Sequence, residues 1–369
     1  MTKVTYIISD IDKALAFEWI VEEIDKNRFE LSFILLNPGP SVLEEWLKEK
    51  NITVLRIKCS GKGDWLSAWL KIKKTLRRWK PDAVHCHLLK ANILGLSAAR
   101  RVGIKKRIYT RHHGSLHHVY HKKGIFWDRF ANKRGTHIVA ISSVVKKILT
   151  NWEKVPPQKV VLIPHGFRLG EFETVSPPRI NAVRERYQVS ENIPVIGVIA
   201  RLTEWKGVQY IIPAFYEVLK DFPEAVLMLF NANGDYKETI LKMLENIPEK
   251  NYRLIPFEKD IPAAYKIFNV FVHTPVDDHS EAFGQTYVES LAAGVPSVFS
   301  LSGIASDFIK DGSNALTVPF KDSDSIAAAI KKILLDGHLS SALAAQGKKD
   351  VQRDFELEKM VSSLEELYG

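Results

Sequence analysis

The stretch Val195-Ile-Gly-Val-Ile-Ala-Arg-Leu-Thr-Glu-Trp-Lys-Gly-Val208 contains the unit that decides the fold. An apolar run ends at Ala200, a polar turn follows it, and a helical pattern begins near Gly207. Near-continuous apolar strands that alternate with helices are typical of parallel sheets covered by helices on both faces. The stretch therefore predicts a doubly wound α/β fold.

The same unit recurs along the whole chain, in two sets. The first half contains short β-branched runs at residues 4–9, 31–36, 53–57, 83–86, 107–110, 138–141 and 160–163. The second half contains them at residues 195–200, 226–230, 252–256, 270–273, 297–300 and 316–318. The 369 residues are also long enough for two hydrophobic cores. We therefore expect two tandem Rossmann-like doubly wound domains that face a cleft at the carboxyl ends of their strands.

The domain boundaries follow from the change in pattern between the two sets. We expect an N-terminal domain over residues 1–170, a linker over 171–192 and a C-terminal domain over 193–350. The linker segment is polar, contains Pro177-Pro178 and lacks a strand period, which is typical of a connection between domains. Residues 351–369 end in an amphipathic pattern that predicts a last helix.

Charge is distributed unevenly between the two halves. The net charge of +9 arises from a balance of +18 over residues 1–168 and −9 over residues 169–369. A strongly basic half attracts anions, so we expect an anionic partner there. The chain contains no zinc-finger, RNA-binding aromatic or basic coiled-coil motif, which argues against nucleic acid as that partner.

The sequence lacks the patterns of a membrane-spanning or secreted protein. Its longest apolar runs are far shorter than the roughly 18 residues that a spanning helix needs, and its first residues lack the cleavage site of a secretion signal. Cys59 and Cys86 stand in no disulfide, metal-ligand or redox spacing. We expect a cytoplasmic protein, with peripheral attachment to the inner face of a membrane as an open alternative.

A second informative stretch is Ser280-Glu-Ala-Phe-Gly-Gln-Thr-Tyr-Val-Glu-Ser-Leu-Ala-Ala-Gly-Val-Pro296. Helix formers from Gln285 to Ala293 follow a turn at Phe283-Gly284, and a Gly-Val-Pro sequence closes the helix. The first amides of a helix lack an intrahelical partner and carry the positive end of its dipole. We therefore expect the amides of Gly284, Gln285 and Thr286 to bind a phosphate.

Two carboxylates and two cations accompany this phosphate site. Glu281 and Glu289 flank the helix start, and carboxylates accept hydrogen bonds from hydroxyls, so the pair suits the two sugars of a nucleotide sugar. Arg201 and Lys206 follow the strand at 195–200, where ligand-binding side chains stand in α/β folds. Two cations at this spacing can neutralise a diphosphate without a metal.

The motifs Arg201-Leu-x-x-x-Lys206-Gly, Glu281-Ala-Phe-Gly and Glu289-Ser-Leu-Ala-Ala-Gly-Val-Pro resemble the donor domain of the family-4 retaining glycosyltransferases of GT-B architecture. The resemblance covers essentially the whole chain, including Lys80-Pro-Asp-Ala-Val-His-Cys-His87. It implies that Arg201 and Lys206 neutralise the donor diphosphate and that Glu289 holds the ribose hydroxyls. It also implies that Glu281 lies at the transferred sugar. Phe283, in the same motif, is a further expected donor-binding residue. We expect no metal cofactor, and a final helix that crosses back onto the N-terminal domain.

In the N-terminal half, Tyr109-Thr-Arg-His-His-Gly114 ends a predicted strand. The resemblance places His112 beside the reacting sugar, with His113 as an alternative, so His112 and Glu281 are the expected catalytic residues from opposite domains. The candidate acceptor-binding residues are His113, His117, His118, Lys122 and Lys123. A metal is not expected at these histidines, because no acidic residue precedes Asp128 in the segment.

Three further segments leave alternatives open. Ser9–Ala16 stands where most family members have a glycine-rich turn, which leaves the acceptor and any phosphate contact from that loop undefined. Asn231–Gly234 stands where the family usually has Gly-x-Gly, and only Gly234 is left there to supply a permissive turn near the nucleotide. Asp10-Ile-Asp12 resembles a metal-binding motif of another glycosyltransferase architecture, but its place directly after the first strand favours a turn. The helical stretch Trp65–Trp79, with three tryptophans among lysines and arginines, fits a helix that covers the sheet and, alternatively, one at a membrane surface.

These features together predict a retaining glycosyltransferase that uses a nucleotide sugar such as a UDP-sugar. The acceptor is expected to be anionic or lipid-linked, as in polysaccharide or glycolipid biosynthesis. A sugar-nucleotide epimerase of the same architecture and a non-catalytic two-lobed binding protein are the alternatives.

Overall fold

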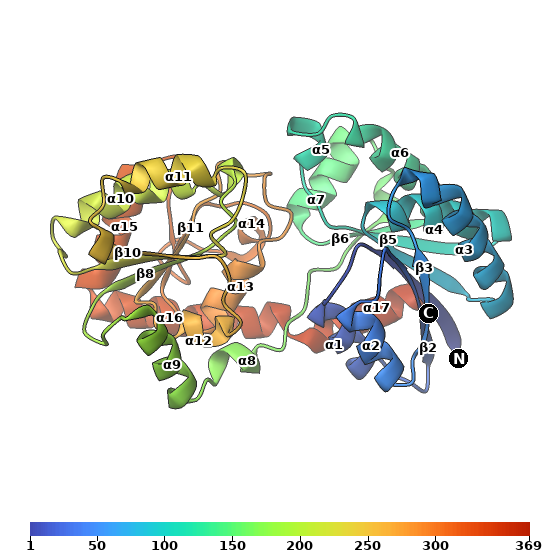
Figure 1. Ribbon diagram of the computed structural model, residues 1–369, viewed down its shortest axis with the longest axis horizontal. Coiled ribbons are helices and arrows are strands. Elements are labelled where there is room, and N and C mark those ends of the chain that lie inside the picture. The colour runs from blue at the N-terminus through green and yellow to red at the C-terminus, as the bar shows by residue number, and fades with distance from the viewer. The chain divides into compact units, whose positions relative to one another are not determined.

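The computed structural model describes residues 1–369, and the chain divides into two compact units. The first unit consists of Met1–Phe167 together with Leu357–Gly369, and the second of Arg168–Glu356. Figure 1 shows that each unit is a parallel sheet with helices packed against it. The two α/β domains with parallel sheets that the sequence predicts are therefore confirmed.

The first unit contains a seven-stranded parallel sheet in the order β3-β2-β1-β4-β5-β6-β7. Its strands are β1 (Thr2–Ser9), β2 (Phe29–Asn37), β3 (Thr53–Lys58), β4 (Ala83–His87), β5 (Lys106–Arg111), β6 (His137–Ala140) and β7 (Val160–Leu162). Its helices are α1 (Leu15–Glu23), α2 (Val42–Glu49), α3 (Trp65–Trp79), α4 (Leu89–Val102), α5 (Leu116–Val119), α6 (Gly124–Arg134), α7 (Ser143–Lys147) and α17 (Leu357–Tyr368).

The second unit contains a six-stranded parallel sheet in the order β10-β9-β8-β11-β12-β13. Its strands are β8 (Val195–Ile199), β9 (Val226–Phe230), β10 (Tyr252–Ile255), β11 (Val270–His273), β12 (Ser297–Phe299) and β13 (Leu316–Thr317). Its helices are α8 (Gly170–Glu173), α9 (Pro177–Tyr187), α10 (Val208–Leu219), α11 (Lys237–Leu244), α12 (Ile261–Tyr265), α13 (Gln285–Ala292), α14 (Ala305–Phe308), α15 (Ser323–Leu335) and α16 (Gly337–Phe355).

All thirteen predicted strands are present, with ends that agree within two residues. Every residue of β4, β8 and β9 is buried, because helices cover both faces of each sheet. Gly197 in β8 allows the ring of Phe268 to pack directly on the strand, where a Cβ atom would overlap it. The apolar runs are therefore long because no strand face is left to solvent.

The segment 171–192, expected to be a linker, belongs instead to the second unit. Pro177 and Pro178 occupy the first positions of α9, where proline is favoured because the first amides of a helix need no partner. Arg179 of this helix binds both oxygens of Asp260 at 2.7 and 2.9 Å. A Pro-Pro pair looks the same in the sequence whether it starts a helix or lies in a loop. For this reason the sequence predicted a linker where the structure has α9.

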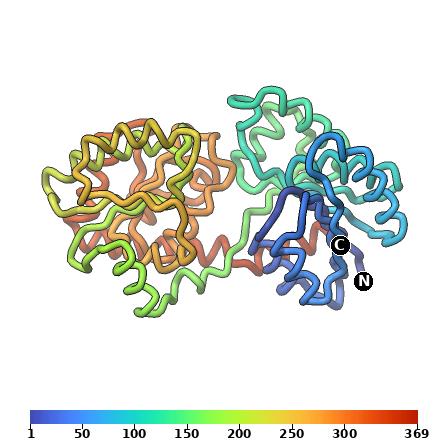
Figure 2. Tube along the Cα trace, viewed as in Figure 1, coloured from blue at the N-terminus to red at the C-terminus, as the bar shows by residue number.

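The chain returns to the first unit through its last helix. Helix α16 ends at Phe355, Glu356 adopts an extended backbone with ψ of 141°, and α17 starts at Leu357. Figure 2 shows this red C-terminal segment beside the blue N-terminal one. Tyr368 is buried there, and its hydroxyl is bonded to Tyr6 and, at 2.7 Å, to Nδ1 of His85.

The loop after β1 forms the turn that the sequence favours over a metal motif. Asp10 has a positive φ of 53° and pairs with Lys90 at 2.5 Å. Asp12 accepts a hydrogen bond from the amide of Val42 at 3.2 Å. Both carboxylates therefore serve the local structure.

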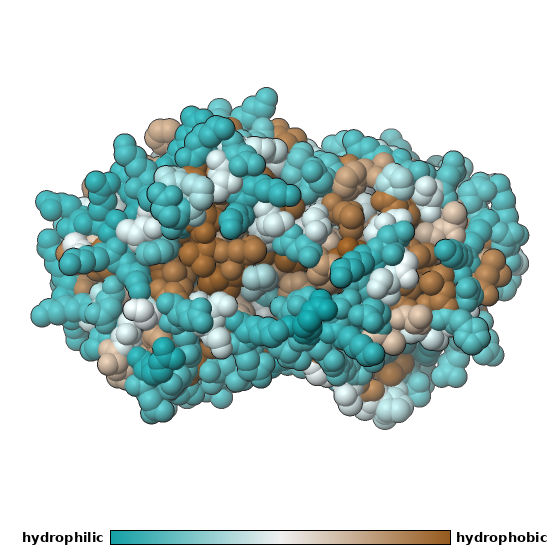
Figure 3. Space-filling model, turned by 180° about the vertical axis from the view of Figure 1, so that it is seen from behind, coloured by the Kyte–Doolittle hydropathy of each residue, from teal (hydrophilic) through white to brown (hydrophobic).

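The surface is polar with apolar areas between the charged groups. On the face in Figure 3, polar side chains predominate in both units, and apolar areas lie between them. Cys59 and Cys86 are free and buried. None of the helices combines the length and the apolar character that crossing a membrane requires.

Candidate functional site

The candidate donor site lies in the second unit, where the strand order of the sheet reverses. β8 and β11 are neighbours in the sheet but not in the sequence, so the segments that follow them start side by side at the carboxyl edge. Such switch points are where open α/β sheets bind their ligands. Arg201 and Lys206 follow β8, and Glu281 follows β11.

The loop after β8 packs closely on the end of β11. Gly207 has a φ of 76°, and a Cβ atom there would overlap the carbonyl oxygen of Thr274. Only glycine fits both the positive φ and this approach. The glycine of the Lys206-Gly207 pair therefore lets the lysine reach the segment that follows β11.

Lys206 and Glu281 form an ion pair that connects these two segments. His273, the last residue of β11, adds a bond from Nε2 to the same carboxylate oxygen at 3.2 Å. Burial opposes ionisation of Glu281, but the charge of Lys206 and the hydrogen bond from His273 outweigh it, so the pKa of Glu281 is lowered. Glu281 is therefore a carboxylate at neutral pH.

The start of α13 stands beside this pair. Gly284 is its N-cap, with a φ of 84° and no side chain to cap the first amides. The predicted phosphate-binding amides of Gly284, Gln285 and Thr286 therefore lie in the first turn of a helix, as expected. Phe283, immediately before, is buried.

Glu289 lies one turn inside α13. Its Oε2 accepts a hydrogen bond from the hydroxyl of Tyr265 at 2.9 Å. Desolvation outweighs this bond and raises the pKa of Glu289 to about 7. The carboxyl is therefore partly protonated at neutral pH, unlike that of Glu281.

Four buried polar atoms around the switch point have no hydrogen-bond partner: Thr203 Oγ1, His273 Nδ1, Thr274 Oγ1 and Thr286 Oγ1. Buried polar groups are nearly always hydrogen-bonded, so a cluster of unpaired ones indicates the place of a polar ligand. Thr286 was predicted from the sequence, but Thr203, His273 and Thr274 were not. Their positions at the ends of β8 and β11 are a signal that could have identified them.

In the first unit, His112 directly follows β5. Its Nε2 lies 2.9 Å from Nδ1 of His87, and its ring stacks on His165 with centroids 5.7 Å apart. Burial lowers the pKa of His112 to about 3 and that of His165 to about 4. His112 is therefore a neutral imidazole, which can hydrogen-bond a sugar hydroxyl but carries no charge.

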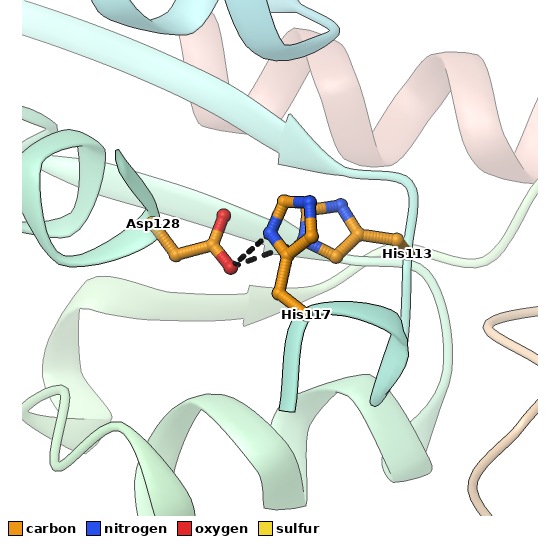
Figure 4. Close-up of side chains that lie close together, drawn as sticks. All are labelled: His113, His117 and Asp128. Carbon is orange, nitrogen blue, oxygen red and sulfur yellow. Dashed lines mark hydrogen bonds and ion pairs between the residues drawn. The ribbon is translucent and has the colours of Figure 1, made fainter. Parts of the chain in front are cut away.

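The other histidines of this segment contact two buried carboxylates. His113 and His117 are bonded to Asp128, as Figure 4 shows, and His118 is bonded to Glu153 at 3.1 Å. These three predicted acceptor-binding side chains therefore have protein partners, while Lys122 and Lys123 are exposed on the following turn.

Comparison with known proteins adds to this geometry. Residues 180–350 match the model of "Glycosyl transferases group 1", and residues 20–171 match that of "Glycosyltransferase Family 4". The chain is 26% identical over 317 residues to the capsular polysaccharide biosynthesis glycosyltransferase CapM of Staphylococcus aureus, covering 82% of this chain and 80% of the relative. It is 23% identical over 361 residues to the UDP-Gal:alpha-D-GlcNAc-diphosphoundecaprenol alpha-1,3-galactosyltransferase of Escherichia coli, covering 94% and 90%.

Solved structures share the fold over the full length. HepE of Anabaena in complex with UDP and glucose superposes with a TM-score of 0.85 at 18% identity and 99% coverage of both chains. WaaG, a glycosyltransferase involved in lipopolysaccharide biosynthesis, superposes with a TM-score of 0.72 at 12% identity, again with 99% coverage of both chains. Because two family models account for nearly all of the chain and the GT-B fold is present, this protein belongs to the family-4 glycosyltransferases.

Proposed function

We propose that the protein transfers a sugar, with retention of configuration, from a nucleoside diphosphate sugar to an anionic or lipid-linked acceptor. The observation that supports this most is the group of unpaired buried hydroxyls beside the Lys206–Glu281 pair and the open start of α13. HepE is known in complex with UDP-glucose, and the relative in Escherichia coli is a UDP-galactose enzyme. Both support a UDP-sugar as the donor.

Each donor-site residue has a role that its chemistry fits. Arg201 and Lys206 neutralise the diphosphate, and the amides of α13 bind one of its phosphates. Glu289 accepts hydrogen bonds from the ribose. With two cations and the amides at the start of α13 available, the site binds the diphosphate without a metal ion.

Glu281 and His112 act at the transferred sugar. Glu281 is ionised and can accept bonds from sugar hydroxyls, whereas neutral His112 can donate or accept one. Neither is assigned as a nucleophile. The departing phosphate takes the proton of the acceptor hydroxyl as the new glycosidic bond forms on the same face, which accounts for retention.

A panel of nucleoside diphosphates and nucleotide sugars tests the donor assignment. A ligand at 100 times its dissociation constant stabilises the folded state by about 2.7 kcal/mol, which a thermal-shift assay detects. We expect UDP and a UDP-sugar to raise the melting temperature. Transfer to water or acceptor identifies a transferase, whereas a second nucleotide sugar formed without acceptor would show an epimerase instead.

The ionisation of Glu289 gives a pH test of its contact with ribose. Because ribose hydroxyls donate to the carboxylate and the pKa of Glu289 in the free protein is about 7, UDP should bind more tightly as pH rises. From pH 6 to pH 8 we expect roughly a tenfold gain, with proton release on binding. Calorimetry in buffers of different ionisation enthalpy measures both.

Glu289→Gln is the control for this titration, since it keeps the shape of the side chain but cannot ionise. The variant should retain only the pH dependence that comes from the phosphate of UDP itself. If the wild type and Glu289→Gln show the same pH profile, Glu289 does not contact the ribose.

The acceptor side of the proposal rests on the basic first unit. Helix α3 packs on α4 and β3 and buries Ala68, Ile72 and Leu76, as expected for a helix that covers the sheet. Leu66 nevertheless remains 71% exposed. The ring of Trp65 contacts Trp127 at 5.5 Å, which brings the start of α3 next to the start of α6.

Phe126, beside Trp127, is 64% exposed, and basic side chains in or just before α3 and α6 are also exposed: Lys62, Lys71, Lys74, Lys122 and Lys123. Exposed aromatic and aliphatic side chains on helices that also carry exposed lysines suit the interface of an anionic lipid bilayer. We name this set, with Trp65, Leu66 and Trp127, the α3–α6 surface and propose that it attaches the protein to the membrane that carries the acceptor.

Vesicle sedimentation tests the α3–α6 surface. The protein should sediment with phosphatidylglycerol vesicles but not with phosphatidylcholine vesicles, and raising salt from about 0.05 to 0.5 M should release it, since exposed charges are screened. The same rise in salt should change UDP affinity less than it changes vesicle binding. Leu66→Ser and Phe126→Ser should reduce sedimentation, while Leu335→Ser, an equally exposed site in the second unit, should not. Salt-independent binding or equal effects of all three variants would contradict the assignment.

A further inference from the structure

We propose that His113, His117 and Asp128 form a binding site for a zinc ion in the first unit. The three side chains come from separate segments: His113 from the loop after β5, His117 from α5 and Asp128 from α6. Figure 4 shows both imidazole rings turned toward one oxygen of the carboxylate. None of the three residues belongs to the donor site, and the proposal does not depend on which sugar or acceptor the protein uses.

The ligand atoms are already spaced for a small cation. Asp128 Oδ2 lies 2.7 Å from Nδ1 of His117 and 3.2 Å from Nε2 of His113, and the three atoms lie within 4.8 Å of one another. In tetrahedral zinc sites with bonds of about 2.0 to 2.1 Å, neighbouring ligand atoms are about 3.3 Å apart. The distance of 3.2 Å between His113 and Asp128 matches this value. The nitrogen of His117 and the oxygen of Asp128 must move apart by roughly half an ångström to reach it.

The carboxylate is held in place by a partner on its other oxygen. Arg111 Nη1 bonds to Asp128 Oδ1 at 2.9 Å, and the same guanidinium binds Glu153. This leaves Oδ2 for the two histidines. Groups that orient a metal ligand from outside are a regular part of zinc sites, and Arg111, which is almost fully buried, orients Asp128 in this way.

The packing also fixes the ring of His117 and leaves a path to solvent at His113. Gly124 lies so close to the ring of His117 that a Cβ atom would overlap it. The side chain of Asp128 is 3% exposed and that of His117 11%, but His113 is 23% exposed. An ion can therefore enter past His113, and a water can fill the fourth position.

The donor set selects for zinc over harder cations. Two imidazole nitrogens and one carboxylate oxygen suit Zn²⁺, whereas Mg²⁺ and Ca²⁺ prefer oxygen ligands. From the sequence we expected no metal here, because no acidic residue stands among the histidines. Asp128 reaches them only because α6 folds back against α5. A bound ion would tie together the loop that carries His112, α5 and α6.

Zinc binding to the wild-type chain tests the proposal directly. The protein, residues 1–369, is freed of metal with a chelator and dialysed. It is then titrated with ZnCl₂ by calorimetry and, in parallel, with Co²⁺ while its visible absorption is recorded. We expect one ion per chain, a rise in melting temperature and the intense bands of four-coordinate Co²⁺. If zinc binds weakly without fixed stoichiometry, or Co²⁺ gives only the faint spectrum of the hydrated ion, the three residues are a hydrogen-bonded cluster and the proposal is wrong.

Matched variants assign the ligands. His113→Gln and His117→Gln should each weaken zinc binding at least 100-fold, more than the loss of an outer partner does. His118→Gln is the control, because this residue is in the same helix and is bonded to Glu153 rather than Asp128. Equal loss in His117→Gln and His118→Gln would overturn the assignment. Because the Co²⁺ spectrum is recorded on the wild type, a variant that fails to fold does not affect the result.

Discussion

Replacing Arg201 with alanine is expected to weaken UDP binding by about 2 to 5 kcal/mol, because a charge-assisted pair with the diphosphate is lost. This corresponds to about 30-fold to several thousand-fold in the dissociation constant. The side chain of Arg201 is exposed and stands in no ion pair with a carboxylate of the chain, so the folded state should keep its stability. Calorimetry with UDP measures the loss, and the melting temperature without ligand confirms the fold.

Lys206→Ala should weaken UDP binding by a similar amount, but it also leaves Glu281 buried without its cation. Its melting temperature should therefore fall, which Arg201→Ala should not show. Lys242→Ala, on the exposed side of α11, is the control for the loss of one positive charge. In that variant UDP affinity should stay unchanged, and adding chelator should have no effect on it. UDP affinity that is unaltered in Arg201→Ala, or lost in chelator, would falsify the metal-free diphosphate site.

Glu281→Gln is expected to lower turnover about 100-fold or more, the range measured when one preorganised hydrogen-bonding group at a reacting centre is removed. UDP affinity should change much less, because Arg201, Lys206 and α13 hold the nucleotide. The variant frees Lys206 from its partner carboxylate, so UDP affinity can even rise. Steady-state kinetics with the donor found in the nucleotide panel, together with UDP calorimetry, separate the two effects.

His112→Ala should behave in the same way, with a loss of turnover and little loss of UDP affinity. Glu204→Gln is the matched control, because Glu204 is an exposed glutamate in the loop that carries Lys206. If turnover and UDP affinity fall by the same factor in Glu281→Gln, Glu281 maintains the structure of the site and does not contact the sugar.

The strands and the donor motif could be predicted from the sequence because their signals are local. A strand such as β8 is an uninterrupted apolar run, since both of its faces are buried. The start of α13 is marked by Gly284 before a run of helix formers. In both cases a few consecutive residues determine the backbone, so neighbours far away in the chain add little.

Contacts between distant segments were decided only by the tertiary structure. Lys206 meets Glu281, 75 residues later, because the strand order reverses between β8 and β11, and this also places His273 and Thr274 in the site. Asp128 joins His113 and His117 through the packing of α6 on α5. The assignment of residues 171–192 to the second unit likewise depended on partners such as Asp260, which sequence periodicity does not reveal. Local patterns determine which elements form, whereas the burial of polar groups in the assembled units determines which side chains meet.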